Sequence, residues 1–190
     1  MPGTALLIMD GQQGIVERYA DGSGPLLRTL ARAAGAARAA GVPVVYVRVA
    51  FRAGAPEISA RNRTFAARAG AAGLGEDDPA THIHPDIAPA AGDIVVVKKR
   101  VSAFTGSDLD VVLRSLDATH LVLTGIATSG VVLSTLRQAA DLDFGLTVLA
   151  DGCADADPEV HRVLLEKVFP RQATVRPTDD WIADLPPSAG

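Results

Sequence analysis

Short apolar runs recur along the chain, separated by longer segments of mixed polarity. Most of these runs are rich in Val, Ile and Leu and are apolar at consecutive positions rather than at alternate ones. Continuous apolar runs of this length are typical of strands that are buried on both faces of a sheet. The predicted strands are Ala5–Met9, Val42–Val49, Ile94–Val97, His120–Leu123, Leu146–Leu149 and Ala173–Arg176.

Most segments between these runs carry apolar residues at helical spacing. The predicted helices are Leu26–Ala40, which follows a loop marked by Gly22, Gly24 and Pro25, then Ser107 or Asp108 to about Leu116, Gly130–Asp141 and Pro158–Phe169. A further helix is predicted within Ser59–Ala69, and Trp181–Gly190 is a tail. Alternating strands and helices indicate an α/β fold. We therefore predict one three-layer α/β/α, Rossmann-like domain over residues 1–190, with a six-stranded parallel sheet.

The stretch His120–Asp155 is a strand–helix–strand unit, around which the rest of the chain is arranged. A turn, Thr124–Ser129, joins the first strand to its helix, and Thr128 or Ser129 is the natural N-cap. Such a unit points the turn and the helix N-terminus at the carboxyl edge of the sheet, where open α/β proteins bind ligands. The sequence therefore predicts the functional site at this turn.

Charge and composition exclude several classes of function. The formal net charge is −4 without a cluster of Lys and Arg, which argues against nucleic acid or an anionic membrane as a partner. No apolar run is long enough to cross a bilayer, and the N-terminus lacks the basic segment of a signal peptide. The single cysteine, Cys153, excludes an intrachain disulfide and suits a reducing compartment. We expect a cytoplasmic protein.

The segment Ala50–Asp93 is long for a connection in a compact domain, which is typical of a lid or an interface. Phe51 in this segment is either a wall of a pocket or an ordinary core aromatic. His82 and His84 lie two residues apart, but no third ligand accompanies them. We therefore predict no metal site and no cofactor.

The turn and the helix after it resemble the signature of a known family. Gly125–Val132, followed by Ser134–Asp141, is similar to the signature loop and helix of the isochorismatase-like hydrolases, also called the cysteine hydrolase family. Two further stretches match the same family, namely the opening run with Ala5, Leu6, Leu7, Asp10 and Gln12, and the run from Lys98 to Leu109. The resemblance spans roughly residues 4 to 175 and implies the fold of that family.

The resemblance also implies which residues form the site. Asp10 would be the catalytic acid or base and Lys98 the catalytic lysine, whereas Val131 stands where amidase members carry their nucleophilic cysteine. Valine has no nucleophilic atom, so covalent amide hydrolysis at this position is excluded. The expected substrate-binding positions are Gln12, Phe51, Phe104, Ile126, Ala127, Thr128, Ser129 and Gly130.

The backbone of the turn carries a further expectation from the family. A cis peptide bond is expected between Ile126 and Ala127. The N–H groups of Thr128 to Val131 would then face a bound anion, assisted by the helix N-terminus.

Three interpretations remain open. In the first, the protein resembles the isochorismatases, which hydrolyse a vinyl ether without a cysteine. Asp10 would protonate the alkene, water would be the nucleophile, and Lys98 would anchor the carboxylate of a small anionic substrate. This role requires strong burial of Asp10, because an ordinary Asp titrates at about pH 4 and a nearby lysine lowers its pKa further.

In the second interpretation, another nucleophile substitutes for the cysteine. Cys153, Ser129 and Ser134 are the candidates, although Cys153 is more simply a packing residue. A histidine base, His120 or His161, would reach a serine only through the fold. In the third interpretation, the protein is an inactive relative that binds a small molecule or acts as a scaffold.

Self-association is also implied, because family members commonly form homodimers or larger homo-oligomers. The long segment Ala50–Asp93 would supply the extra surface. We expect light scattering at micromolar concentration to give a mass well above that of one chain. A single species with the mass of one chain would contradict this expectation.

Overall fold

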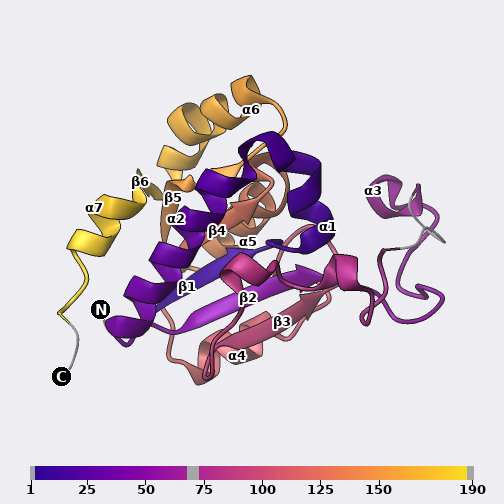
Figure 1. Cartoon of the computed structure of the whole chain (residues 1–190), viewed down its shortest axis with the longest axis horizontal. Coiled ribbons are helices and arrows are strands. Elements are labelled where there is room, and N and C mark those ends of the chain that lie inside the picture. Colours follow the sequence, from indigo (N-terminus) through magenta and orange to yellow (C-terminus); the bar gives the residue numbers. More distant parts are fainter. Residues whose placement is uncertain (1–2, 68–72, 188–190) are drawn as a thin grey trace.

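The six predicted strands form one sheet in which every adjacent pair is parallel (Figure 1). The computed structural model describes residues 3–67 and 73–187, with only the backbone for residues 19–23. The strand order is β3-β2-β1-β4-β5-β6, which confirms the predicted six-stranded parallel sheet. The strands are β1 (Thr4–Met9), β2 (Val44–Val49), β3 (Ile94–Lys98), β4 (His120–Ile126), β5 (Gly145–Ala154) and β6 (Thr174–Arg176).

The sheet reverses its direction of growth between β1 and β4. From β1 the chain adds β2 and β3 on one side and then returns to pair β4 with the other side of β1. Parallel α/β sheets bind ligands in the crevice at such a switch point, beyond the carboxyl ends of the strands. Asp10 directly follows β1 and Ala127 directly follows β4, so the order of the strands brings these two chain segments to the switch point.

Helices cover both faces of the sheet, which confirms the three-layer architecture (Figure 1). Successive residues of a strand point to opposite faces. Leu7 and Met9 of β1 accordingly join one core with α4 (Leu109–Ser115), α5 (Leu133–Asp141) and the helix of α6 (Pro158–Val163) and η5 (Leu164–Val168). Leu6 and Ile8 join the opposite core with α2 (Ala20–Ala39) and α7 (Thr178–Ala183).

The remaining helices are short and lie mostly in connections. They are α1 (Gln13–Val16), η1 (Glu17–Tyr19), α3 (Arg63–Ala66), η2 (Pro79–Thr81), η3 (Pro85–Ile87), η4 (Thr128–Val132) and η6 (Phe169–Arg171). Within the ranges 3–67 and 73–187, no helix combines the length and the apolar character that a membrane span requires.

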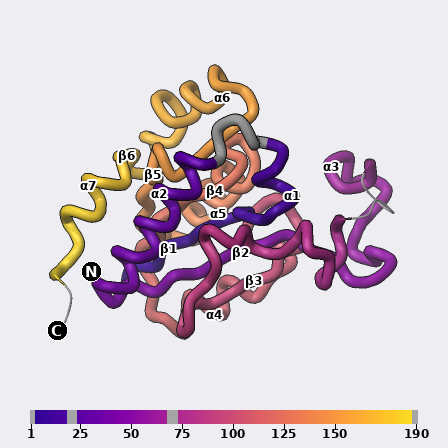
Figure 2. Tube along the Cα trace, viewed as in Figure 1, coloured from indigo at the N-terminus to yellow at the C-terminus, as the bar shows by residue number. Residues whose placement is uncertain are grey.

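The segment between β2 and β3 leaves the body of the molecule beyond the ends of these strands, as the trace in Figure 2 shows. A small third core of Val49, Phe51, Phe65 and Leu74 joins parts of this segment, α3 among them, to the end of β2. The predicted helix at residues 59–69 is mostly wrong, because only α3 forms, with Asn62 capping it through the N–H of Phe65 at 3.2 Å. The last two predicted residues lie outside the described part of the chain.

The structure extends β4 through residues that the sequence predicted as a turn. Gly125, read as a turn residue, is paired with Met9 of β1 and has a φ of +139°. A Cβ atom added to Gly125 would lie 2.2 Å from the carbonyl oxygen of Met9. Glycine is therefore needed for the close approach of β4 to β1 rather than for a turn.

The strand β5 likewise runs past its predicted end at Leu149 and continues to Ala154. Its pairing with β4 resumes at Cys153, opposite Gly125, after an irregularity. In the same way, the loop predicted at Gly22, Gly24 and Pro25 is part of α2. Glycine weakens a helix by about 1 kcal/mol but does not end one whose later turns pack on a sheet.

The predicted tail is helical up to Ala183, where α7 covers the α2 face of the sheet. Trp181 is 2% exposed in this core. Burial of its large apolar surface contributes to the stability of the fold. Asp151, at the end of β5, accepts hydrogen bonds from both the N–H and the hydroxyl of Thr178, each at 2.8 Å. Residues 188–190 lie outside the described chain.

This packing predicts that Trp181→Ala strongly destabilises the protein. Truncating a buried tryptophan typically costs about 3–5 kcal/mol, through lost burial and the cavity that remains. Val111→Ala is the control, because Val111 is 68% exposed and exposed substitutions usually change stability by less than about 0.5 kcal/mol. The free energy of unfolding in denaturant measures both variants. Equal small losses would show that α7 contributes little to the core.

Candidate active site

A buried ion pair joins the ends of β1 and β3 across the end of β2. The Nζ atom of Lys98 lies 2.9 Å from Oδ2 of Asp10, and the two residues are 1% and 6% exposed. The predicted proximity of these two residues is therefore confirmed. The backbone of Asp10 is left-handed, with a φ of 58°, a conformation that Asp tolerates better than most residues. This turn aims its side chain back across the strand ends toward Lys98.

All three ammonium hydrogens of Lys98 are used in hydrogen bonds within the protein. Besides Asp10, its ammonium donates to the carbonyl oxygens of Arg100 at 3.1 Å and Val101 at 2.9 Å. A lysine ammonium has three hydrogens and no further donor. The predicted role of Lys98 as a direct anchor for a substrate carboxylate therefore does not hold in this arrangement. Its charge serves Asp10 instead.

Asp10 keeps one carboxylate oxygen uncommitted. Among the described residues, Oδ1 of Asp10 is buried and has no hydrogen-bond partner, while Oδ2 faces Lys98. Burial raises the pKa of Asp10 above its ordinary value, because the loss of hydration outweighs the opposing effect of the Lys98 charge. The burial that an acid role for Asp10 requires is thus present. A carboxyl group in this state can both hold and release a proton.

The signature turn, which we define as Ile126–Gly130, lies at the end of β4. Its first peptide bond, Ile126–Ala127, is cis. Ile126 is buried in the core on the α2 face and Thr128 is fully buried. After the turn the chain makes one π-helical turn, η4, and continues as α5, close to the predicted helix start at Gly130.

Two of the amides expected to cradle an anion already have partners within the protein. The N–H of Ser129 donates to Oδ2 of Asp155 at 2.7 Å, and the N–H of Gly130 donates to the carbonyl of Ala127 at 3.0 Å. The predicted anion cradle is therefore wrong at these two positions. A carboxylate of the protein itself occupies the place where Ser129 would have met a ligand.

Val131 and Cys153 lie in the same apolar core, on the α5 face of the sheet. Val131 is 2% exposed and Cys153 is 5% exposed. Burial, with a smaller contribution from the nearby Asp151, raises the pKa of the Cys153 thiol to about 12, although a hydrogen bond with the backbone of Gly125 opposes the shift. A thiol with this pKa is not a thiolate at neutral pH, so Cys153 packs like a small apolar residue.

The two histidines considered as bases contact threonines rather than serines. His161 Nδ1 lies 2.8 Å from the hydroxyl of Thr128, and His120 Nε2 lies 2.9 Å from that of Thr147. Ser129 is exposed and Ser134 is half-buried. In the hydrogen bonds of residues 3–67 and 73–187, neither serine hydroxyl meets a histidine, so no serine triad forms.

Gln12, predicted to bind substrate, holds the backbone together instead. Its amide nitrogen donates to the carbonyls of Val49 and Thr81, both at 2.9 Å, and its oxygen accepts the N–H of Val49 at 2.7 Å. Both amide hydrogens are thus used within the protein. Gln12 ties the end of β1 to the end of β2 and to the segment that follows the protruding α3.

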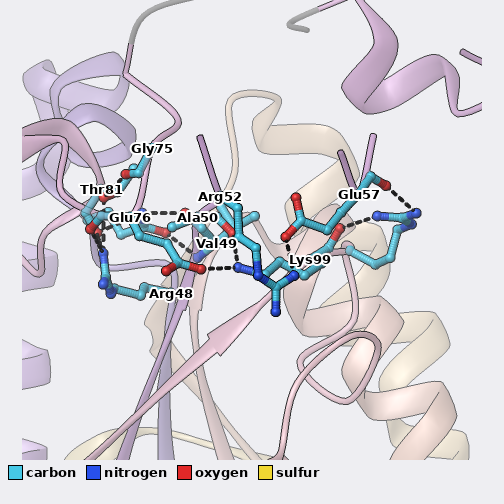
Figure 3. Close-up of polar contacts among 11 residues, drawn as sticks. Arg48, Val49, Ala50, Arg52, Glu57, Gly75, Glu76, Thr81 and Lys99 are labelled. Carbon is cyan, nitrogen blue, oxygen red and sulfur yellow. Dashed lines mark hydrogen bonds and ion pairs between the residues drawn. The ribbon is translucent and has the colours of Figure 1, made fainter. Parts of the chain in front are cut away.

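A polar network outside the predicted set secures the same segment (Figure 3). Arg48 of β2 donates to the carbonyl of Glu76 and to the hydroxyl of Thr81, each at 3.0 Å. Lys99 donates to the carbonyl of Ala50 at 2.7 Å and to the carboxylate of Glu76 at 2.5 Å. No sequence pattern predicted this network. The cation run beginning at Lys98 was its only signal, since the partners lie more than 20 residues away.

The two predicted aromatic positions are core residues for most of their surface. Phe51 is 1% exposed and packs edge-to-face on Phe65 at 5.3 Å between ring centroids. Phe104 is 8% exposed and lies 6.1 Å from the ring of Phe144. Phe51 also borders a surface hollow that Arg52 and Gly75 line. In the part of the chain that the structure describes, no three His, Cys, Asp or Glu residues cluster as a metal site would require.

The ion pair predicts a pH-dependent effect of Lys98→Met. Removing one partner of a buried pair typically costs about 3–5 kcal/mol, because it leaves a buried charge without compensation. The variant also loses the group that holds the pKa of Asp10 down, so this pKa rises further. The protonated carboxyl is the tolerated form, so stability returns as the pH falls.

Thermal unfolding at several pH values between about 8 and 4 tests this pH dependence. The range ends at about pH 4 because an Asp in the unfolded chain titrates there. The gap in Tm between wild type and Lys98→Met should narrow toward acid. Lys167→Met is the control, because Lys167 is exposed and its loss should change Tm little at any pH. A gap that is the same at all pH values would contradict the pairing.

Residues 4–180 match the isochorismatase domain family. The isochorismatase family protein YecD of Escherichia coli O157:H7 is 34% identical over 96% of both chains. The ureidoacrylate amidohydrolase RutB of Serratia proteamaculans is 35% identical, over 96% of this chain and 79% of its own length.

Structural similarity leads to the same family. The structure of an isochorismatase family protein from Burkholderia thailandensis superposes with a TM-score of 0.82 at 30% identity, covering 97% of this chain and 96% of that one. The family match covers nearly the whole chain and includes both residues of the buried ion pair. The chain belongs to the isochorismatase family of hydrolases.

Proposed function

We propose that this protein hydrolyses a small anionic molecule without a cysteine nucleophile, with Asp10 as the acid and base and water as the nucleophile. One feature carries the proposal, namely the free oxygen Oδ1 of the buried Asp10 beside Lys98. A carboxyl group whose pKa burial raises above its ordinary value is suited to general acid–base catalysis. Fully paired carboxylates, by contrast, have no lone pair to offer a substrate.

Two reactions fit this assignment. With a vinyl ether, Asp10 would donate its proton to the alkene carbon, water would add to the resulting cation, and the hemiketal would collapse to a ketone and an alcohol. With a C–N bond, water would attack the carbonyl carbon while Asp10 takes a proton from that water. Asp10 would then give the proton to the leaving nitrogen as the C–N bond breaks. The name of RutB, a ureidoacrylate amidohydrolase, makes the second bond worth testing here.

In this proposal Lys98 is a positioning residue for Asp10 rather than a substrate anchor. Its charge favours the ionised form of Asp10, and its hydrogen bond to Oδ2 fixes the direction in which Oδ1 points. The apolar side chain of Val131 stands in the place of the family cysteine, which leaves water as the nucleophile. The proposed compartment is the cytoplasm, and the proposed state is a homo-oligomer.

A second candidate function is that of an inactive relative that binds a small molecule. The contact between Asp155 and the N–H of Ser129 favours it, because an amide expected to stabilise an anion is already occupied. The free oxygen of Asp10 favours the hydrolase, since a buried polar atom without a partner reduces stability unless it serves a function.

Asp10→Asn tests the hydrolase. The amide cannot exchange a proton in the reaction, so turnover of isochorismate or ureidoacrylate should fall by about 10²–10⁴, the usual contribution of a general acid or base. Cys153→Ala is the control and should keep turnover close to wild type, because Cys153 packs in the core. Circular dichroism verifies that both variants fold.

The opposite results would overturn the proposal. Full activity of Asp10→Asn would remove Asp10 from the mechanism, and loss of activity in folded Cys153→Ala would make that thiol the nucleophile. Absence of turnover in the wild-type protein on both substrates would favour the inactive relative.

A further inference from the structure

Two histidine–threonine pairs of similar geometry lie at opposite edges of the sheet. Thr128, just past the end of β4, pairs with His161 of α6 at 2.8 Å. His120, the first residue of β4, pairs with Thr147 of β5 at 2.9 Å. Both imidazoles have their pKa lowered by burial. The two pairs differ in place, since only the first touches the signature turn.

The segment after β5 grips the signature turn at two points. His161 holds the hydroxyl of Thr128, and Oδ2 of Asp155 accepts the N–H of Ser129 at 2.7 Å. Asp157 caps the start of α6 through the N–H groups of Glu159 and Val160, which fixes the helix that carries His161. Thr128 and Ser129, two adjacent residues of the turn, are thus held by side chains that follow β5 in the chain.

We propose that His161 is a positioning residue that fixes the signature turn through Thr128, in the geometry on which turnover at Asp10 depends. The inference rests on the proposed function for its catalytic part. The turn follows β4 and Asp10 follows the neighbouring strand β1, so a displacement of the turn moves the wall of the site beside Asp10 at the carboxyl edge of the sheet.

The same contact does not make Thr128 a nucleophile. A hydroxyl bonded to an imidazole resembles a nucleophile and its base, but Thr128 is fully buried and no substrate atom can reach it. Burial lowers the pKa of His161, and the nearby Asp155 opposes this shift. The imidazole therefore favours its neutral form, in which Nδ1 either accepts the hydrogen of Thr128 or donates to its oxygen.

Four variants separate a positioning role from a general structural one. His161→Leu removes the contact, whereas His161→Asn places an amide group where Nδ1 lies and should restore it. Thr128→Val removes only the hydroxyl and serves if His161→Leu fails to fold. His120→Leu is the matched control, because it breaks the equivalent pair at the other edge of the sheet.

Amide hydrogen exchange of the folded proteins gives a readout that needs no substrate. The N–H of Ser129 donates to Asp155, and the N–H groups of Gly130 and Val132 donate to the carbonyl of Ala127. Their exchange should become about tenfold faster in His161→Leu and Thr128→Val, because local opening is easier without the outside contact. It should stay near wild type in His161→Asn and in His120→Leu.

Turnover of isochorismate or ureidoacrylate is the second readout. We expect kcat to fall about tenfold in His161→Leu and Thr128→Val while KM changes less, because a misplaced wall affects chemistry more than binding. His161→Asn should recover most of kcat. Unchanged exchange at the turn, or equal effects from His120→Leu, would overturn the proposal. If wild-type protein turns over neither substrate, the proposed function fails, and exchange alone then decides whether His161 positions the turn.

Discussion

The buried contact between Asp10 and Lys98 is the interaction on which the site depends. Two charges that leave water lose several kcal/mol of hydration each, and they persist in a protein only when they compensate one another. Here Lys98 reaches across the end of β2 to Asp10 and fixes itself on the carbonyls of Arg100 and Val101. The ends of β1 and β3 are therefore held in one arrangement, and Oδ1 of Asp10 is left without a hydrogen-bond partner among the described residues.

Further hydrogen bonds and one more ion pair, between Lys99 and Glu76, hold the rest of the carboxyl edge around this pair. Gln12 joins the ends of β1 and β2, while Arg48 and Lys99 hold the segment that contains Glu76 (Figure 3). The opposite wall depends on Gly125, since any side chain there would collide with the carbonyl of Met9 and push β4 away from β1. Positions with no chemistry of their own thus set the distances within the site.

The signature turn keeps an ordered shape beside an apolar core. Val131, just past the turn, is buried in the same core as Cys153, on the α5 face of the sheet. The signature turn is held by Asp155 and His161 from outside. Its shape therefore does not depend on a thiol at Val131.

The sequence by itself determined the parallel α/β sheet, its six strands, and the identity of Asp10 and Lys98 as partners. Continuous apolar runs indicate strands that are buried on both faces of the sheet. The residues that follow the predicted strands lie at the same edge of a parallel sheet. Tertiary structure alone decided which partner each polar group binds. Lys98, Gln12 and Ser129 have the residue types of ligand-binding groups, yet contacts such as that between Gln12 and Thr81, 69 residues apart, occupy them. It also buried Trp181 and paired His161 with Thr128, because residue spacing does not encode which helix covers which strand end.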